Sequence, residues 1–173
     1  MKALLTTVLL LTYFTGAFAA DDAAKKPAEE AVFREPFTLK LQIDKEHFYE
    51  KEFTKMAYVH EDNVYLFKGD EFGLTLDIQD GSIRAVKYQP DVKKADVTLK
   101  FTQEVDAGGT AMMMLHIHNN TKQPLDVDAL MTVPNEKKTF KTSILTVQPG
   151  LSGFESWPHP IVQLVLRNIR FKK

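Results

Sequence analysis

LTLDIQDGSIRAVK, residues 74–87, is the stretch of this sequence that decides the fold. Apolar and polar side chains alternate on both sides of Asp80-Gly81, and these two residue types tolerate the positive φ angles of a type I′ turn. Because a two-residue turn sets the register of the flanking strands, the stretch predicts an antiparallel hairpin with defined partners. The expected pairs are Ile78 with Ile83, Leu76 with Ala85, Leu74 with Lys87 and, on the other face, Asp77 with Arg84 as an ion pair.

The same period of two recurs outside this hairpin and indicates further half-buried strands. Residues 125–133 alternate without a break before Pro134. The other expected strands are residues 37–43, 57–60, 64–67, 97–101, 111–118, 140–147 and 161–171, the last with a bulge near Arg167-Asn168. Residues 44–56 fit either a short helix capped by Asp44 or a loop that leads into a strand. Residues 150–160 (GLSGFESWPHP) are expected to form a long loop.

About eight to ten short strands with closely spaced turn signals are typical of a sandwich or a barrel. No helix longer than three turns competes with this pattern. The sequence therefore predicts an all-β fold, an immunoglobulin-like antiparallel β-sandwich, with a closed β-barrel as the alternative.

The N-terminus reads as an export signal. Lys2 precedes an apolar run, and Ala17-Phe18-Ala19 is a small-x-small cleavage motif, so residues 1–19 are expected to be a signal peptide cut near Ala19-Ala20. The apolar run is shorter than the roughly 20 residues that span a bilayer, which argues against the alternative of an uncleaved anchor. Residues 20–35 are expected to be a flexible charged spacer, and residues 36–173 a single β-sandwich domain.

Composition narrows the setting of this domain. The chain has no cysteine, although an oxidising compartment permits disulfides, and this favours a bacterial periplasmic or secreted protein. The formal net charge of −1 lacks the basic excess of a nucleic-acid binder. No second apolar segment is long enough for a transmembrane helix.

One expected strand carries possible metal ligands. On residues 111–118, Met112, Met114, His116 and His118 share one face, whereas Met113, Leu115 and Ile117 share the other. Thioether and imidazole groups suit copper in both of its oxidation states. An odd-numbered loop with Gly108 or Gly109 in the left-handed conformation would turn the histidines toward solvent.

The partners of the histidines are predicted from a hairpin between residues 111–118 and 125–133. A five-residue loop at 120–124 would match the apolar side chains of the two strands. It would also place His118 opposite Asp126 and His116 opposite Asp128, adding two carboxylates to the candidate metal site. The alternative is an ordinary solvent-facing row of His–Asp pairs.

The segment 150–160 holds the second candidate site. It contains Trp157, the single tryptophan, together with Phe154 and His159. An aromatic side chain in a proline-framed loop can contact a ligand or a partner protein. The alternative is that Trp157 covers the open end of the sandwich.

Catalytic signatures do not stand out. No serine has nucleophile-elbow glycines around it, no P-loop or dinucleotide fingerprint occurs, and thiol chemistry is excluded. We therefore expect a non-catalytic exported protein, without a cofactor, that binds a partner protein or a small ligand in the cell envelope. The alternatives are a periplasmic copper-binding or copper-delivery protein, and an inhibitor or immunity protein against an envelope-directed enzyme.

Overall fold

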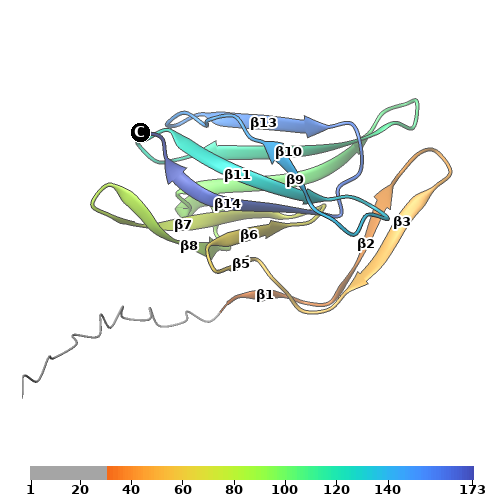
Figure 1. Ribbon diagram of the computed structural model, residues 1–173, viewed down its shortest axis with the longest axis horizontal. Coiled ribbons are helices and arrows are strands. Elements are labelled where there is room, and N and C mark those ends of the chain that lie inside the picture. Colours follow the sequence, from red (N-terminus) through yellow and green to blue (C-terminus); the bar gives the residue numbers. More distant parts are fainter. Residues whose placement is uncertain (1–30) are drawn as a thin grey trace, which may run out of the picture.

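The computed structural model describes residues 31–173, which fold as an all-β sandwich of two five-stranded antiparallel sheets. The first sheet has the strand order β13-β10-β9-β7-β8, and the second has the order β12-β11-β14-β6-β5. The sheets lie face to face (Figure 1). The predicted sandwich is confirmed, and the alternative of a closed barrel is wrong, because each sheet keeps two free edges.

The elements follow the chain as fourteen strands and one 3₁₀ turn within the described residues. They are β1 (Phe33–Arg34), β2 (Phe37–Gln42), β3 (Phe48–Phe53), β4 (Met56–Ala57), β5 (Val59–His60), β6 (Asn63–Leu66), β7 (Glu71–Gln79), β8 (Ser82–Gln89), η1 (Val92–Lys94), β9 (Val97–Val105), β10 (Ala111–Asn119), β11 (Leu125–Thr132), β12 (Phe140–Ser143), β13 (Ser152–Trp157) and β14 (Gln163–Phe171).

The core lies between the two sheets and follows the alternation of the sequence. Met113, Leu115 and Ile117 of β10 are buried, as predicted. They belong to one hydrophobic cluster with Leu125 and Ala129 of β11 in the opposite sheet. Burial of each large apolar side chain contributes about 1.5–3 kcal/mol. A strand turned over so that these side chains faced solvent would therefore be much less stable.

The hairpin of β7 and β8 has the predicted turn, with φ angles of 51° at Asp80 and 71° at Gly81. Ile78 pairs with Ile83 as expected. Beyond that pair the predicted register is wrong, because Arg84 is an extra residue that forms a bulge. The observed pairs are Asp77 with Ala85, Leu76 with Val86 and Leu74 with Tyr88.

The bulge has a physical reason. Without it, Lys87 would take the inward position opposite Leu74. With one extra residue, Val86 and Tyr88 turn toward the core and Lys87 is released from it. Asp77 consequently lies opposite Ala85, so the expected pairing with Arg84 is not formed.

Residues 44–56 follow the loop-and-strand alternative. The Asp44 carboxylate accepts hydrogen bonds from the backbone N–H groups of Glu46 and His47, which makes a tight turn into β3. β2 and β3 form a two-stranded hairpin that extends from one end of the sandwich (Figure 1). Gln103 ties this hairpin to β9, because its side-chain amide makes two hydrogen bonds with the backbone of Gln42.

Two other predicted segments are corrected. Residues 152–157 form β13, an edge strand of the first sheet, and not part of a loop. Glycine and serine have low strand propensity, but pairing with β10 outweighs it. The predicted strand 140–147 is regular only as β12, after which the chain leaves β11 and returns to it at Val147. The predicted bulge in the last strand is confirmed at Asn168, where φ is 49°.

The start of the domain is also earlier than predicted. Phe33–Arg34 pair with β4, so residues 33–34 of the expected spacer belong to the fold. The Arg34 side chain is buried and hydrogen-bonds to Asp70 and to the carbonyl groups of Ala57 and Tyr65. The predicted signal peptide and the first part of the spacer lie outside the described residues. Within residues 31–173, no helix is long and apolar enough to cross a membrane.

Candidate functional site

The outward face of β10 has the predicted composition. Met112 is exposed, and Met114, His116 and His118 are half-buried on the same outer surface of the first sheet. The five-residue loop before β10 contains Gly109 with a φ of 82°, which agrees with the predicted odd-numbered, left-handed turn. This loop places the buried side chains of β10 beside the buried side chains of β9. The histidines, which alternate with them, therefore face outward.

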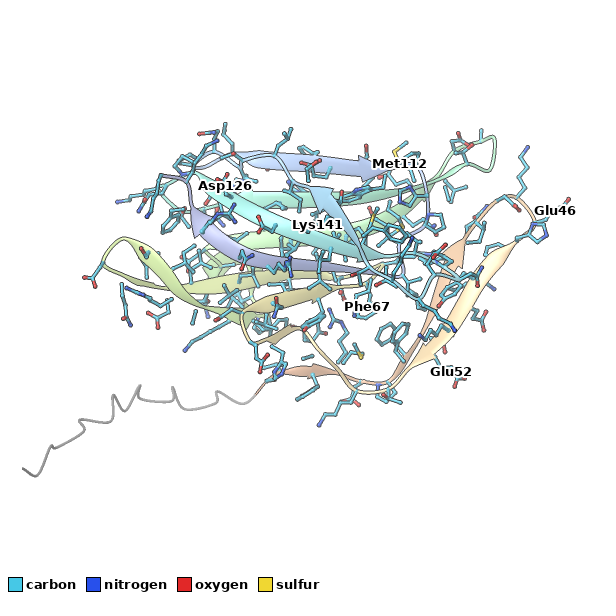
Figure 2. The ribbon with its side chains drawn as sticks, in the orientation of Figure 1. Glu46, Glu52, Phe67, Met112, Asp126 and Lys141 are labelled. Atoms are coloured by element: carbon cyan, nitrogen blue, oxygen red, sulfur yellow. The ribbon has the colours of Figure 1, made fainter. Side chains whose placement is uncertain are left out.

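The predicted partnership of these histidines with Asp126 and Asp128 is wrong. β10 pairs with β9 and β13, whereas β11 pairs with β12 and β14 in the other sheet. Residues 120–124 are thus a crossover between sheets and not a hairpin loop. The aspartates lie on β11 of the second sheet and Met112 on β10 of the first, and Figure 2 shows Asp126 and Met112 near opposite ends of the sandwich. Pairing by apolar matching failed because the same apolar faces meet across the core instead of side by side.

Both aspartates have other partners. Asp126 accepts a hydrogen bond from the Thr146 hydroxyl at 2.7 Å. Asp128 accepts hydrogen bonds from the side chains of Asn168 at 2.9 Å and Arg170 at 3.0 Å. These two donors hold the pKa of the Asp128 carboxyl below its ordinary value, because they stabilise the ionised form.

His116 is covered by an aromatic ring. Its imidazole stacks on the Phe154 ring with a centroid separation of 4.5 Å and an interplanar angle of 2°. The His116 Nε2 atom is buried and has no hydrogen-bond partner among the described residues. His118 instead contacts the Ser152 hydroxyl through Nδ1 at 3.0 Å. The two rings thus have separate partners on β13.

A metal site on this face has few ligands. No group of three or more His, Asp or Glu side chains in residues 31–173 is placed to hold a metal ion. A copper ion would therefore depend on the two thioethers and two imidazoles of β10 alone. Binding through Nε2 of His116 would require neighbouring groups to move, because this nitrogen is buried.

The predicted trio of residues 154, 157 and 159 does not form one site. Phe154 is 64% exposed on the outer surface of the first sheet. Trp157 is buried in the core, where its Nε1–H donates to the Thr142 hydroxyl at 2.8 Å and its ring meets Phe101 edge to face. Trp157 is therefore a core residue at the end of β13 and not an exposed aromatic side chain of a loop. His159 lines a cavity that neither Phe154 nor Trp157 borders.

That cavity, the end pocket, is an apolar hollow of about 460 Å³ at the end of the sandwich near the β2–β3 hairpin. It is lined by Ile43, Met131, Val133, Pro134, Asn135, Phe140, His159 and Pro160. The lining comes from the end of β2, the end of β11 and the turn after it, the start of β12 and the segment before β14, so the pocket exists only where the β2–β3 hairpin meets the second sheet. Its size and apolar character are typical of small-ligand sites, with His159 and Asn135 as the polar groups.

Sequence reasoning missed most of the end pocket. Only His159 was singled out, and for another reason. Val133-Pro134 and Ile43 carried a weak signal, since each is an apolar continuation of a strand pattern beyond the point where the strand ends. Their convergence depends on which strand ends lie together, which is a property of the sheet order.

The shortest carboxylate–imidazole contact in the described residues joins Asp44 and His47, with Oδ1 2.8 Å from Nδ1. Hydrogen bonds from the backbone N–H groups of Glu46 and His47, with the His47 ring, lower the pKa of Asp44. Both side chains are exposed and belong to one tight turn. The contact therefore stabilises the turn and lacks the buried, convergent setting of an acid–base pair.

Comparison with known proteins adds no family: no family model, curated protein or solved structure matches this chain.

Proposed function

We propose that this chain is an exported, non-catalytic binding protein that holds a small, largely apolar molecule in its end pocket. The observation that carries the proposal is the pocket itself, in which partly exposed apolar side chains from four segments face one hollow. Apolar surface kept open at such a convergence is stabilised when a ligand covers it. Export is supported by the N-terminal sequence pattern.

The lining also favours binding over catalysis. His159 is the one ionisable side chain among the residues that line the end pocket. General acid–base or nucleophilic chemistry needs at least a second positioned group. A single imidazole beside the Asn135 amide can instead orient one hydrogen-bonding group of a ligand whose remainder is apolar.

The test is saturation of the end pocket with the neutral fluorescent probe N-phenyl-1-naphthylamine. Saturable enhancement of its emission is expected for the wild type. Val133→Lys should abolish the enhancement, because a cationic side chain in the lining removes the apolar environment. The matched control is Leu145→Lys, since Leu145 is 74% exposed and does not line the end pocket.

Each variant is checked by its thermal midpoint before titration, so that loss of binding is separated from loss of fold. Equal enhancement in Val133→Lys and wild type would show that the probe binds elsewhere and would contradict the proposal. Equal loss in Val133→Lys and Leu145→Lys would contradict it as well.

A further inference from the structure

A second pocket lies on the outer surface of the second sheet, opposite the face that carries His116. It has a volume of about 470 Å³ and opens where β12 leaves β11. Asp128 still pairs with Ser143, but the next contact between the two chain segments is the bridge from Leu125 to Val147. The chain from 144 to 146 bows away from β11 and leaves the hollow, which we call the bulge pocket. Asp126 and Lys141 on its walls are labelled in Figure 2.

The bulge in β14 brings two arginines to this pocket. Residues three apart on a regular strand point to opposite faces. The extra residue at Asn168 shifts the register, so that Arg167 lies opposite Asp128 and Arg170 lies opposite Asp126. Both guanidinium groups consequently reach the same outer surface. Bulges often re-aim side chains in this way beside functional sites.

The bulge pocket carries excess positive charge. Four lining side chains are basic, and two are acidic. The basic residues are Lys141, Arg167, Arg170 and Lys172; the acidic ones are Asp126 and Asp128. This excess stands out in a chain whose formal net charge is −1.

The basic side chains of the bulge pocket differ in whether they already have hydrogen-bond acceptors within the protein. Arg170 donates to Asp128, and the Lys172 ammonium donates to the Thr146 hydroxyl at 3.0 Å. The Arg167 Nε atom, by contrast, is buried and has no hydrogen-bond partner within the described chain. A buried donor without an acceptor is costly, so Arg167 is a lining cation with hydrogen-bonding capacity that the chain itself leaves unmet.

We infer that the bulge pocket binds the phosphate group of a small phosphate monoester, with Arg167 as its principal donor. A guanidinium group matches phosphate oxygens well, and a monoester near neutral pH carries a charge of about −1.5 to −2, which balances the excess of the lining. The remaining volume and the hydroxyl groups of Ser143 and Thr146 accommodate the organic part of the ligand. This site is separate from the end pocket and does not depend on its function.

The experiment is isothermal titration of the purified protein with glycerol 2-phosphate at fixed ionic strength, with inorganic phosphate and acetate as comparison ligands. The monoester is expected to bind best, inorganic phosphate next and acetate weakest. Arg167→Gln should weaken binding of glycerol 2-phosphate by about tenfold or more, because it removes a charge-assisted hydrogen bond.

Two further variants make the result decisive. Lys141→Gln changes an exposed wall residue and should also weaken binding, which covers the case that Arg167→Gln impairs folding. Arg84→Gln removes the same charge from an exposed site on the first sheet and should leave binding unchanged. Unweakened binding in both pocket variants, equal loss in Arg84→Gln, equal affinity for acetate, or absence of binding by the wild type would each overturn the inference.

Discussion

Arg34 and Asp70 form a bidentate ion pair that fastens the start of the domain to the sandwich. The Arg34 Nε and Nη2 atoms donate to the two carboxylate oxygens of Asp70, at 3.2 and 2.5 Å. The Arg34 guanidinium also lies over the Tyr58 ring, with its central carbon 3.9 Å from the ring centroid. Both side chains are largely buried, so each charge depends on the other for compensation.

Removal of one partner is expected to be strongly destabilising. Arg34→Ala leaves the Asp70 carboxylate buried without its counter-charge and should lower the free energy of unfolding by about 3–5 kcal/mol. Urea unfolding followed by the fluorescence of Trp157 measures the change. Lys40→Ala is the matched control, because the Lys40–Glu50 pair is exposed and should contribute at most about 1 kcal/mol. Similar losses in the two variants would contradict the structural role of Arg34.

Gly73 is expected to tolerate no side chain. A Cβ atom at this position would lie 2.2 Å from the Cβ atom of Ala95, which packs on β7. Gly73→Ala should therefore destabilise the protein by about 1–3 kcal/mol through overpacking. The double variant Gly73→Ala/Ala95→Gly should recover part of the loss, since it removes the clashing methyl group. Thermal unfolding of the three proteins gives the answer, and an unrescued double variant would show that the clash is not the cause.

Asp128 is expected to make stability depend on pH in the acid range. Its pKa in the folded state is lowered by hydrogen bonds from Asn168 and Arg170, below the unfolded value of about 3.9. The stability that it contributes is therefore present above that value and is lost as pH falls through the lower, folded-state pKa.

The measurement for Asp128 is urea unfolding of the wild type and of Asp128→Asn from neutral pH down to about pH 2. The wild type should be the more stable at neutral pH, and the gap should close as the solution is acidified below about pH 4. In an Arg170→Gln background the gap at neutral pH should be smaller, because one of the two donors to the carboxylate is absent. A gap that stays constant with pH would contradict the assigned cause.

A copper titration can distinguish a copper site on the outward face of β10 from an ordinary solvent-facing row of side chains. Because the Nε2 atom of His116 is buried, we expect the wild type and the double variant His116→Ala/His118→Ala to bind Cu(I) and Cu(II) equally weakly. Phe154→Ala removes the ring that stacks on the imidazole, exposes more of His116 and should raise copper affinity. Competition titration against a chelator measures both effects. A large loss of affinity in the double variant would support the copper alternative.

Local features of this fold were predictable because they depend on a few adjacent residues. The turn at Asp80-Gly81 needed only two residues that accept positive φ, and the parity of β10 needed only the alternation from Met113 to Ile117. β13 was not predicted as a strand, because its serine and glycine residues have low strand propensity. Only the partner strand shows that it belongs to a sheet.

The candidate sites were predicted less well, and for one reason. His116 was placed correctly on an outer surface, but its neighbour proved to be Phe154 and not Asp128. An apolar face can be buried equally well by an adjacent strand or by a strand across the core. Apolar matching between β10 and β11 could not distinguish these two arrangements.

The sequence by itself thus determined the β class, the main turns and the inward or outward direction of side chains within each strand, because these follow from backbone geometry and local alternation. The tertiary structure alone decided which strands are neighbours. It set the bulge at Arg84, the convergence of chain segments around His159 and the position of Arg167 and Arg170 opposite Asp128 and Asp126. Those features depend on contacts between different segments of the chain. Several sheet orders would bury the apolar face of each strand, and packing of the whole core selects one of them.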